Sequence, residues 1–185
     1  DIIYLMENKG IAYAQNIGIK KSIEEEADYI ILSDQDTVYP DNYVSEMLKC
    51  FNDEKVAASG PLFIDSHTGK KQFFIVDGSY RFKKIYPTSH KHEVLQLIAS
   101  GTMIKTTVLK DTGLMREDLF IDWVDMEWCW RAVKKGYKII GNADVVILHQ
   151  HGTDAVEVFS KNITLKTPLR YYYAIRNGIY LALYS

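Results

Sequence analysis

Apolar and polar positions along the chain fall into blocks that predict strands and helices in alternation. Residues 2–5 and 29–32 are short apolar runs with polar neighbours, as is typical of strands buried in a sheet. Between them a stripe at spacings of four and three predicts a helix: Ala12, Asn16, Ile19, Ile23 and Ala27. A helix around residues 44–51 and a strand at 56–59 complete a β-α-β-α-β order. This order predicts an α/β fold whose mostly parallel sheet has helices on both faces.

The second part of the chain continues the alternation after a region rich in turns. Residues 73–76 and 80–82 flank Asp77-Gly78, a dipeptide typical of a hairpin turn. Apolar runs predict further strands at residues 95–99, 138–140 and 145–148.

Two helices follow from their end signals. One is expected from about Asp122 to residue 135, because Gly136 is a typical residue just past a helix end. The last begins at Thr167-Pro168, an N-cap followed by the residue that suits the first helical position. Because no repeat or linker interrupts the pattern, we expect one domain over residues 1–185.

Composition and charge narrow the class of protein. The chain has 185 residues, 47% of them hydrophobic, which suffices for one domain with a sizeable core. A formal net charge of -2 gives no general attraction to nucleic acid. Cys50 and Cys129 lie in helical apolar patterns, so we expect buried thiols in a reducing compartment, not a disulfide or zinc site. No apolar run is long enough to span a bilayer.

Two carboxylates follow the apolar run at residues 29–32. Asp34 and Asp36 are one residue apart at the predicted carboxyl end of a strand, which is where open α/β sheets bind ligands. Both side chains can reach one hard cation such as Mg²⁺ or Mn²⁺, which prefers oxygen ligands and often bridges carboxylates to phosphates. The alternative is a pair of turn or helix-capping carboxylates, since an Asp-x-Asp pattern also arises by chance.

Residues 120–131 concentrate acids and tryptophans. If this segment is helical, Asp122, Asp125 and Cys129 share a face. Helix capping explains Asp122, but Asp125 is less readily explained because Asp is a poor helix-interior residue. A carboxylate among apolar side chains can have a raised pKa and act as a general base, whereas the tryptophans could equally be core.

Polar side chains also gather in the last third of the chain. His149 and His151 follow the predicted strand at residues 145–148 and are either metal ligands or surface histidines. The last helix carries Arg170, Arg176 and Asn177 among three consecutive tyrosines. That helix either packs on the domain or lies at a membrane surface.

These segments together resemble family 2 glycosyltransferases of the GT-A fold, most closely the bacterial rhamnosyltransferase-like branch. Residues 7–18 look like the family's Asn-x-Gly…Ala…Asn-x-Gly stretch, and residues 32–37 like its Asp-x-Asp strand end. Residues 99–102 are similar to its cleft loop, and residues 120–131 to the segment that carries its base. The His-x-x-Gly motif falls on residues 149–152, and the Tyr-Tyr…Arg-Asn helix on residues 170–177.

The resemblance implies an inverting transfer of a sugar, with dTDP-rhamnose as the expected donor, to a saccharide or lipid-linked saccharide. It implies cell-surface polysaccharide synthesis at the inner face of a bacterial membrane, with peripheral membrane association. Asp125 would be the base, and Asp34, Asp36 and His149 would hold Mn²⁺ or Mg²⁺. Donor and acceptor contacts are expected from the other motif residues: Asn8, Gly10, Asn16, Gln35, Ser100, Gly101, Thr102, Asp122, Trp123, Glu127, Arg131 and His151.

Two departures from the family pattern bear on these expectations. The opening strand-helix unit that holds the nucleotide base is missing, and the acid that normally precedes the base is Val124. We therefore expect a chain truncated at both ends that binds donor weakly or not at all. Another nucleotide-sugar enzyme, such as a nucleotidyltransferase, and a non-catalytic carbohydrate-binding domain remain as alternatives. A nucleotidyltransferase requires a Gly-rich basic phosphate loop, and a carbohydrate-binding domain does not account for the ordered acids.

Overall fold

Five strands form the central sheet of the computed structural model, which describes residues 2–65, 69, 71–78, 81–149, 155–158, 161–164 and 167–184. Their order across the sheet is β1 (Tyr29–Leu32), β6 (Thr102–Lys105), β2 (Val56–Asp65), β7 (Lys138–His149) and β5 (Lys91–Val94). Two short hairpins form separate two-stranded sheets: β3 (Phe74–Val76) with β4 (Lys83–Ile85), and β8 (Ala155–Val158) with β9 (Lys161–Thr164).

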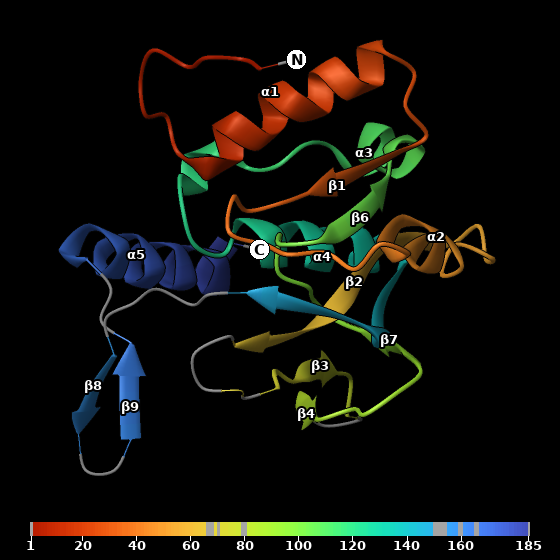
Figure 1. The fold of residues 1–185 in the computed structure, drawn as a ribbon. Coiled ribbons are helices and arrows are strands. Elements are labelled where there is room, and N and C mark those ends of the chain that lie inside the picture. Colours follow the sequence, from red (N-terminus) through yellow and green to blue (C-terminus); the bar gives the residue numbers. More distant parts are fainter. Residues whose placement is uncertain are drawn as a thin grey trace.

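The sheet is mixed, so the α/β fold is confirmed but the expected mostly parallel sheet is wrong. β2 pairs in parallel with β7, whereas β1 and β2 both pair antiparallel with β6, and β5 pairs antiparallel with β7. Insertion of β6 between β1 and β2 leaves β1, β2 and β7 pointing the same way, toward the side of the molecule where α5 lies (Figure 1). The apolar pattern of a short strand reports burial but not the direction of its neighbour, which explains the error.

Helices cover both faces of this sheet, as predicted. One core cluster contains residues of α1 (Ile11–Glu24), α3 (Thr106–Thr112) and α4 (Val124–Lys134), and the other contains residues of α2 (Tyr43–Leu48). Within β6, Ile104 belongs to the first cluster and its neighbour Met103 to the second. Since successive strand side chains point to opposite faces, the two clusters lie on opposite sides of the sheet.

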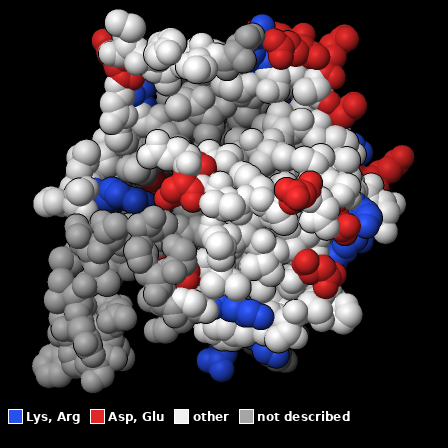
Figure 2. All heavy atoms as spheres, in the orientation of Figure 1, with Lys and Arg blue, Asp and Glu red and all other residues white. Residues whose placement is uncertain are grey.

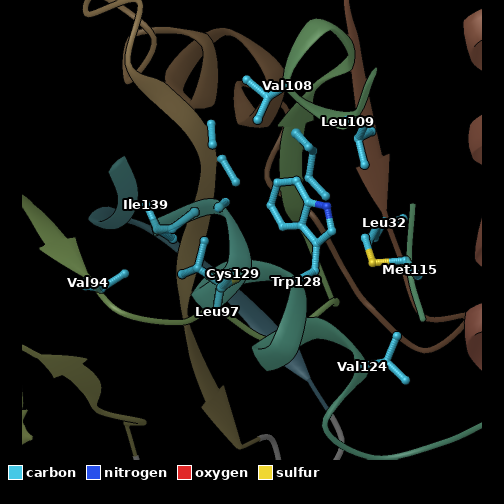
Figure 3. Packing of buried hydrophobic residues seen from close by; sticks show 14 of the residues in the cluster. Leu32, Val94, Leu97, Val108, Leu109, Met115, Val124, Trp128, Cys129 and Ile139 are labelled. Carbon is cyan, nitrogen blue, oxygen red and sulfur yellow. The ribbon is translucent and has the colours of Figure 1, made fainter. Parts of the chain in front are cut away.

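Trp128 of α4 lies in the middle of the larger cluster, among Val108, Leu109 and Met115 (Figure 3). It is 1% exposed, and its indole N–H donates to the carbonyl of Gly113 over 3.1 Å. Burial of a side chain of this size stabilises the fold by about 2–3 kcal/mol. The tryptophan is therefore a core residue, and it fixes α4 against the end of α3.

Several predicted elements differ in the structure. Residues 2–5 form no strand and their apolar side chains are exposed. Residues 95–99 form a loop that packs on α4 instead of a strand, because the antiparallel pairing with β1 begins only at Thr102. The strands predicted at 138–140 and 145–148 are one continuous strand, β7.

Other predictions are confirmed. The helix expected from about residue 122 is α4, and the helix expected after Thr167 is α5 (Pro168–Tyr184). Cys50 and Cys129 are buried, free thiols. Among the described helices, none is both long and apolar enough to cross a bilayer. On the face seen in Figure 2, acidic side chains gather at the top right and several basic side chains lie along the bottom edge.

Candidate active site

A tight turn after β1 carries the paired carboxylates. The N–H of Thr37 donates to the carbonyl of Asp34 over 3.3 Å, and the hydroxyl of Ser33 donates to the same carbonyl over 3.0 Å. Asp34 is half-buried, while Gln35 and Asp36 are exposed. The turn therefore brings both carboxylates to the carboxyl end of β1, as the sequence predicted.

The end of β7 lies beside this turn. The N–H of Val38 donates to the carbonyl of Leu148 over 3.3 Å, so His149 is the next residue along the chain from this contact. The backbone of His149 also pairs with that of Asp65 at the end of β2. The side chain of His149 and the whole of His151 lie outside the described residues. The backbone thus brings His149 to the same edge of the sheet as Asp36.

Residues 99–101 connect the carboxylate turn to the N-terminus of α4. The hydroxyl of Ser100 donates to the carboxylate of Asp34, and the N–H of Gly101 donates to the carbonyl of Leu32 over 2.8 Å. One residue earlier, the N–H of Ala99 donates to Oδ2 of Asp125 over 3.0 Å. We call residues 99–101 the bridging loop, because one short segment holds both Asp34 and Asp125.

Gly101 is required by the geometry of the bridging loop. Its φ is +80°, and a Cβ at this position would lie 2.8 Å from the hydroxyl oxygen of Tyr43 and 3.0 Å from Cγ of Pro61. That Tyr43 hydroxyl donates to the Gly101 carbonyl. Burial raises the pKa of Tyr43, so the phenol stays protonated and keeps this donor. The contact of Tyr43 with Gly101 was not predicted from the sequence, since a tyrosine on the buried stripe of a helix is indistinguishable from a core residue.

Asp125 is half-buried in the first turn of α4 and has backbone partners. Oδ2 accepts the N–H of Ala99, and Oδ1 accepts the N–H of Met126 over 2.9 Å. Burial raises the pKa of its carboxyl above the ordinary value, and the nearby charge of Asp122 adds to that rise. A carboxylate with a raised pKa that has no cationic partner among the described residues is suited to accept a proton.

The segment before α4 adopts an unusual backbone. Phe120, Asp122 and Trp123 all have positive φ angles, of 63°, 61° and 70°. Such conformations cost roughly 1–3 kcal/mol each and persist only where surrounding contacts enforce them. Residues 120–123 are therefore held by their neighbours, and they fix where α4 begins.

Helix α5 supplies many of those contacts. Asn177 is 0% exposed, and its amide N–H groups donate to the carbonyls of Leu119, Ile121 and Asp122. Arg176 donates to the carbonyl of Asp118 over 2.5 Å. The sequence singled out this helix by resemblance but assigned its residues no role, because the contacts join positions more than fifty residues apart.

Helix α1 supplies a contact from the opposite side. The N–H of Ile11 donates to the carbonyl of Phe120 over 2.8 Å, and a Cβ on Gly10 would lie 2.5 Å from that same oxygen. Asn8 accepts the N–H of Gly10 through its side chain over 3.1 Å. Asn8 and Gly10 therefore shape the approach of α1 to the segment before α4.

Six residues expected to contact substrate make contacts within the fold. Asp122 pairs with Arg170 over 2.9 Å, and the Trp123 indole donates to the carbonyl of Ala174 over 2.8 Å, so both dock α5. Glu127 is 6% exposed and forms a two-bond pair with Arg131, whose guanidinium also reaches the carbonyls of Thr112 and Leu114.

The other two of these six residues have short polar side chains. Asn16 is 2% exposed, and its amide bonds Met115 through both its nitrogen and its oxygen, and also Glu117. Thr102 is 4% exposed and donates its hydroxyl to the carbonyl of Ile98 over 2.5 Å. Polar residues in a motif can serve to satisfy buried backbone groups, and substrate contact by these six residues stays a prediction.

The donor atoms near Asp34 and Asp36 fit a hard divalent cation in part. Both supply carboxylate oxygens, and the hydroxyl of Thr37 between this turn and β7 is buried with no hydrogen-bond partner among the described residues. No three described His, Cys, Asp or Glu side chains group closely enough to hold a metal. A full protein site would therefore need the His149 side chain or ligands from the substrate.

Comparisons of the sequence with known proteins identify its family. Residues 1–113 match the model of glycosyl transferase family 2. The chain is 32% identical over 193 residues to the dTDP-rhamnosyl transferase RfbF of Shigella flexneri, covering 97% of this chain and 62% of that protein. The chain thus spans about three-fifths of the length of this relative.

Solved structures show the same fold. GalNAc-T7, crystallised with UDP, GalNAc and Mn2+, superposes with a TM-score of 0.62 at 13% identity over 80% of this chain and 32% of its own. The mannosyltransferase PcManGT of Pyrobaculum calidifontis, in complex with GDP-Man and Mn2+, superposes with a TM-score of 0.55 at 14% identity, over 80% and 39% respectively. The chain therefore has the GT-A fold and belongs to glycosyltransferase family 2.

Proposed function

We propose that the intact protein is an inverting glycosyltransferase that moves a sugar from a nucleotide-diphosphate donor to a hydroxyl group of a saccharide acceptor. The observation that carries this proposal is the bridging loop, which bonds both Asp34 and Asp125. It puts a carboxylate suited to the diphosphate end of a donor next to one suited to the acceptor hydroxyl. The RfbF relative supports dTDP-rhamnose as the donor.

Asp125 would act as the general base. Its raised pKa makes it a better proton acceptor than an ordinary carboxylate, and the Ala99 and Met126 N–H groups fix its orientation. The acceptor hydroxyl gives its proton to Asp125 while its oxygen forms a bond to the anomeric carbon. The bond from that carbon to the diphosphate oxygen breaks on the opposite face, so the configuration inverts.

Asp34, Asp36 and His149 would hold a divalent cation at the diphosphate end. The Mn2+ in two GT-A neighbours and the oxygen donors of this turn support a metal here, whether Mn²⁺ or Mg²⁺. When bound, it supplies positive charge that stabilises the leaving diphosphate. The role of Ser100 is to orient Asp34 through its hydroxyl, and Gln35 is exposed beside it for contact with donor.

The acceptor is proposed to be a cell-surface saccharide or its lipid-linked form, at the inner face of the bacterial membrane. Helix α5 supports a peripheral contact there. It has no acidic residue, and an exposed apolar stripe runs along it: Leu169, Tyr172, Ile175, Ile179 and Leu183. Cosedimentation with anionic phospholipid vesicles tests this part, and Ile175→Glu should weaken it. Equal binding of that variant would remove α5 from the contact.

The reaction itself is tested by incubating the intact protein with a panel of nucleotide sugars and measuring released nucleotide diphosphate. We expect hydrolysis or transfer with one donor class, dTDP-rhamnose first, and dependence on Mn²⁺ or Mg²⁺. In calorimetry, Asp36→Ala should lose the metal-dependent part of dTDP binding. Asp41→Ala, an exposed acid five residues along, is the matched control and should bind as wild type does.

The alternatives predict different products. A nucleotidyltransferase would release pyrophosphate from a nucleoside triphosphate, and a carbohydrate-binding domain would bind glycans without consuming any donor. Family membership, and the bridging loop that bonds both Asp34 and Asp125, favour sugar transfer over these two alternatives. No turnover of any nucleotide sugar, or unchanged metal-dependent affinity in Asp36→Ala, would contradict the proposal.

A further inference from the structure

A cavity of about 170 Å³ lies beside β2, between the β3 strand and the loop at residues 95–98. Phe63 from β2 and Phe73 before β3 line it, together with Gln72, Gln96, Ile98 and Met126. Gly60 and Thr102 also face it. The walls therefore come from segments that are distant in sequence, and the cavity exists only in the folded protein.

The cavity lies near the proposed base, although neither Asp125 nor Ala99 is among the residues that line it. Two of its lining residues, Ile98 and Met126, are the immediate chain neighbours of Ala99 and Asp125. Those two residues are joined by the 3.0 Å bond from the Ala99 N–H to Oδ2 of Asp125, and the Met126 N–H bonds Oδ1. A molecule in the cavity would thus contact the chain neighbours of the two residues whose bond orients the carboxylate.

The chemistry of the lining suits a neutral ligand with both apolar and hydroxyl surfaces. Among the described residues that line it there is no Asp, Glu, Lys, Arg or His, so none of them would match the charge of a diphosphate. Phe63 and Phe73 offer aromatic surface, while Gln72 and Gln96 offer amides. Gln96 bonds Met126 through its nitrogen and Trp130 through its oxygen, and an amide has capacity for two further bonds.

The size limits the occupant. The volume of about 170 Å³ is below the roughly 300–1,000 Å³ typical of pockets for drug-sized ligands. One sugar ring is a suitable occupant, whereas a nucleotide or an oligosaccharide is too large.

We propose that this cavity is the subsite for the sugar ring of the acceptor, with Phe73 against the apolar face of the ring and Gln72 and Gln96 toward its hydroxyls. The proposal rests on the proposed function and adds the place and the neutral, single-ring character of the acceptor group. It assigns Phe63, Gln72 and Phe73 a part in acceptor selection that is separate from donor binding.

Phe73→Ala in the intact protein tests the subsite, with Phe82→Ala as the matched control. Phe82 is 74% exposed and does not line the cavity. We expect Phe73→Ala to raise the KM for acceptor about tenfold, which corresponds to about 1.4 kcal/mol. The KM for donor and the rate of donor hydrolysis without acceptor should stay at the wild-type values, and Phe82→Ala should change none of these.

A second variant distinguishes the loss of acceptor binding from a folding defect. Gln72→Leu keeps the volume but removes the amide, so it should also raise the acceptor KM without lowering the melting temperature. If both variants keep the wild-type acceptor KM, or if both raise the donor KM as much as the acceptor KM, the subsite is wrong.

Direct binding separates this proposal from the proposed function. Saturation-transfer NMR with methyl α-rhamnopyranoside and methyl α-glucopyranoside needs no turnover. Signal from at least one glycoside with the wild type, lost in Phe73→Ala and retained in Phe82→Ala, supports the subsite even if no donor is consumed. Donor turnover together with equal glycoside signal in all three proteins would overturn the subsite and leave the transferase proposal intact.

Discussion

Asp125 and Glu127 lie two residues apart on α4, yet the structure gives their carboxylates opposite surroundings. Asp125 is bonded by the N–H groups of Ala99 and Met126, and burial raises its pKa. Glu127 is bonded by the guanidinium of Arg131 through both oxygens, over 3.0 and 2.9 Å. A carboxylate oriented by amides can still take a proton, whereas one paired with a guanidinium serves the fold. The partner, not the residue type, separates the two roles.

Replacing Asp125 should give the largest effect. Asp125→Asn keeps the size and one acceptor oxygen but cannot take a proton, so transfer should fall about 10⁴-fold, the upper range for loss of a general base. The melting temperature should stay within about 4 °C of wild type, since removal of the burial cost of the charge offsets the loss of one of the two backbone N–H bonds. Initial rates and thermal melts on the same preparation check both parts. Wild-type-like turnover would remove Asp125 from the reaction.

Breaking the second carboxylate pair should change stability instead. Arg131→Met leaves the Glu127 charge buried and unpaired, and should lower the free energy of unfolding by about 3 kcal/mol. Because Arg131 also bonds the carbonyls of Thr112 and Leu114, the end of α3 should loosen as well. Urea unfolding measures the loss, and turnover per folded molecule should change little.

The double variant Glu127→Leu with Arg131→Met sharpens this result. It removes the unpaired charge, so it should be more stable than Arg131→Met alone. If Arg131→Met abolished turnover while leaving stability unchanged, the pair would belong to the active site and the contrast with Asp125 would fail.

The smallest expected effect is on the pH dependence of folding stability, which should have opposite signs for Asp125 and Asp53. Burial raises the pKa of Asp125 in the folded protein above the ordinary value of 3.8. The stability that Asp125 contributes, measured against Asp125→Asn, is therefore fully present below pH 3.8 and is lost as pH rises through the folded pKa. The Lys138 contact lowers the pKa of Asp53, so its contribution is present above 3.8 and is lost as pH falls through its folded pKa. Urea unfolding of Asp125→Asn and Asp53→Asn at several pH values measures both.

The same titration should appear in activity. The acid limb of kcat/KM should lie above the ordinary carboxyl value, because Asp125 must be ionised to accept a proton. Stability differences that move in the same direction for Asp53→Asn and Asp125→Asn would contradict the contrast in their surroundings.

Local features of the fold were predictable where a local signal exists. The start of α5 follows from Thr167-Pro168, and the end of α4 from Gly136. The turn with Asp34 and Asp36 follows from the apolar run before it. The strand predicted at residues 2–5 was wrong because strand formation depends on a neighbouring strand, which an apolar run does not specify.

The assignments of individual polar residues were the least predictable part of the site. Asn16 and Glu127 were expected to face substrate but are held by Met115 and Arg131, while Tyr43 went unnoticed beside Gly101. In each case the deciding partner is set by packing. Motifs give residue types in order, but they do not show which side chains the fold uses to satisfy its own buried groups.

By itself the sequence determined which segments become helices and that acids follow β1 and begin α4, since periodicity and capping are local. Only the tertiary structure decided that these acids are bonded by one loop. Asp34 and Ser100 are 66 residues apart in the chain, and Ala99 and Asp125 are 26 apart. Insertion of β6 between β1 and β2 brings the bridging loop to both carboxylates. Long-range pairing of this kind depends on the packing of the whole sheet, which no local pattern encodes.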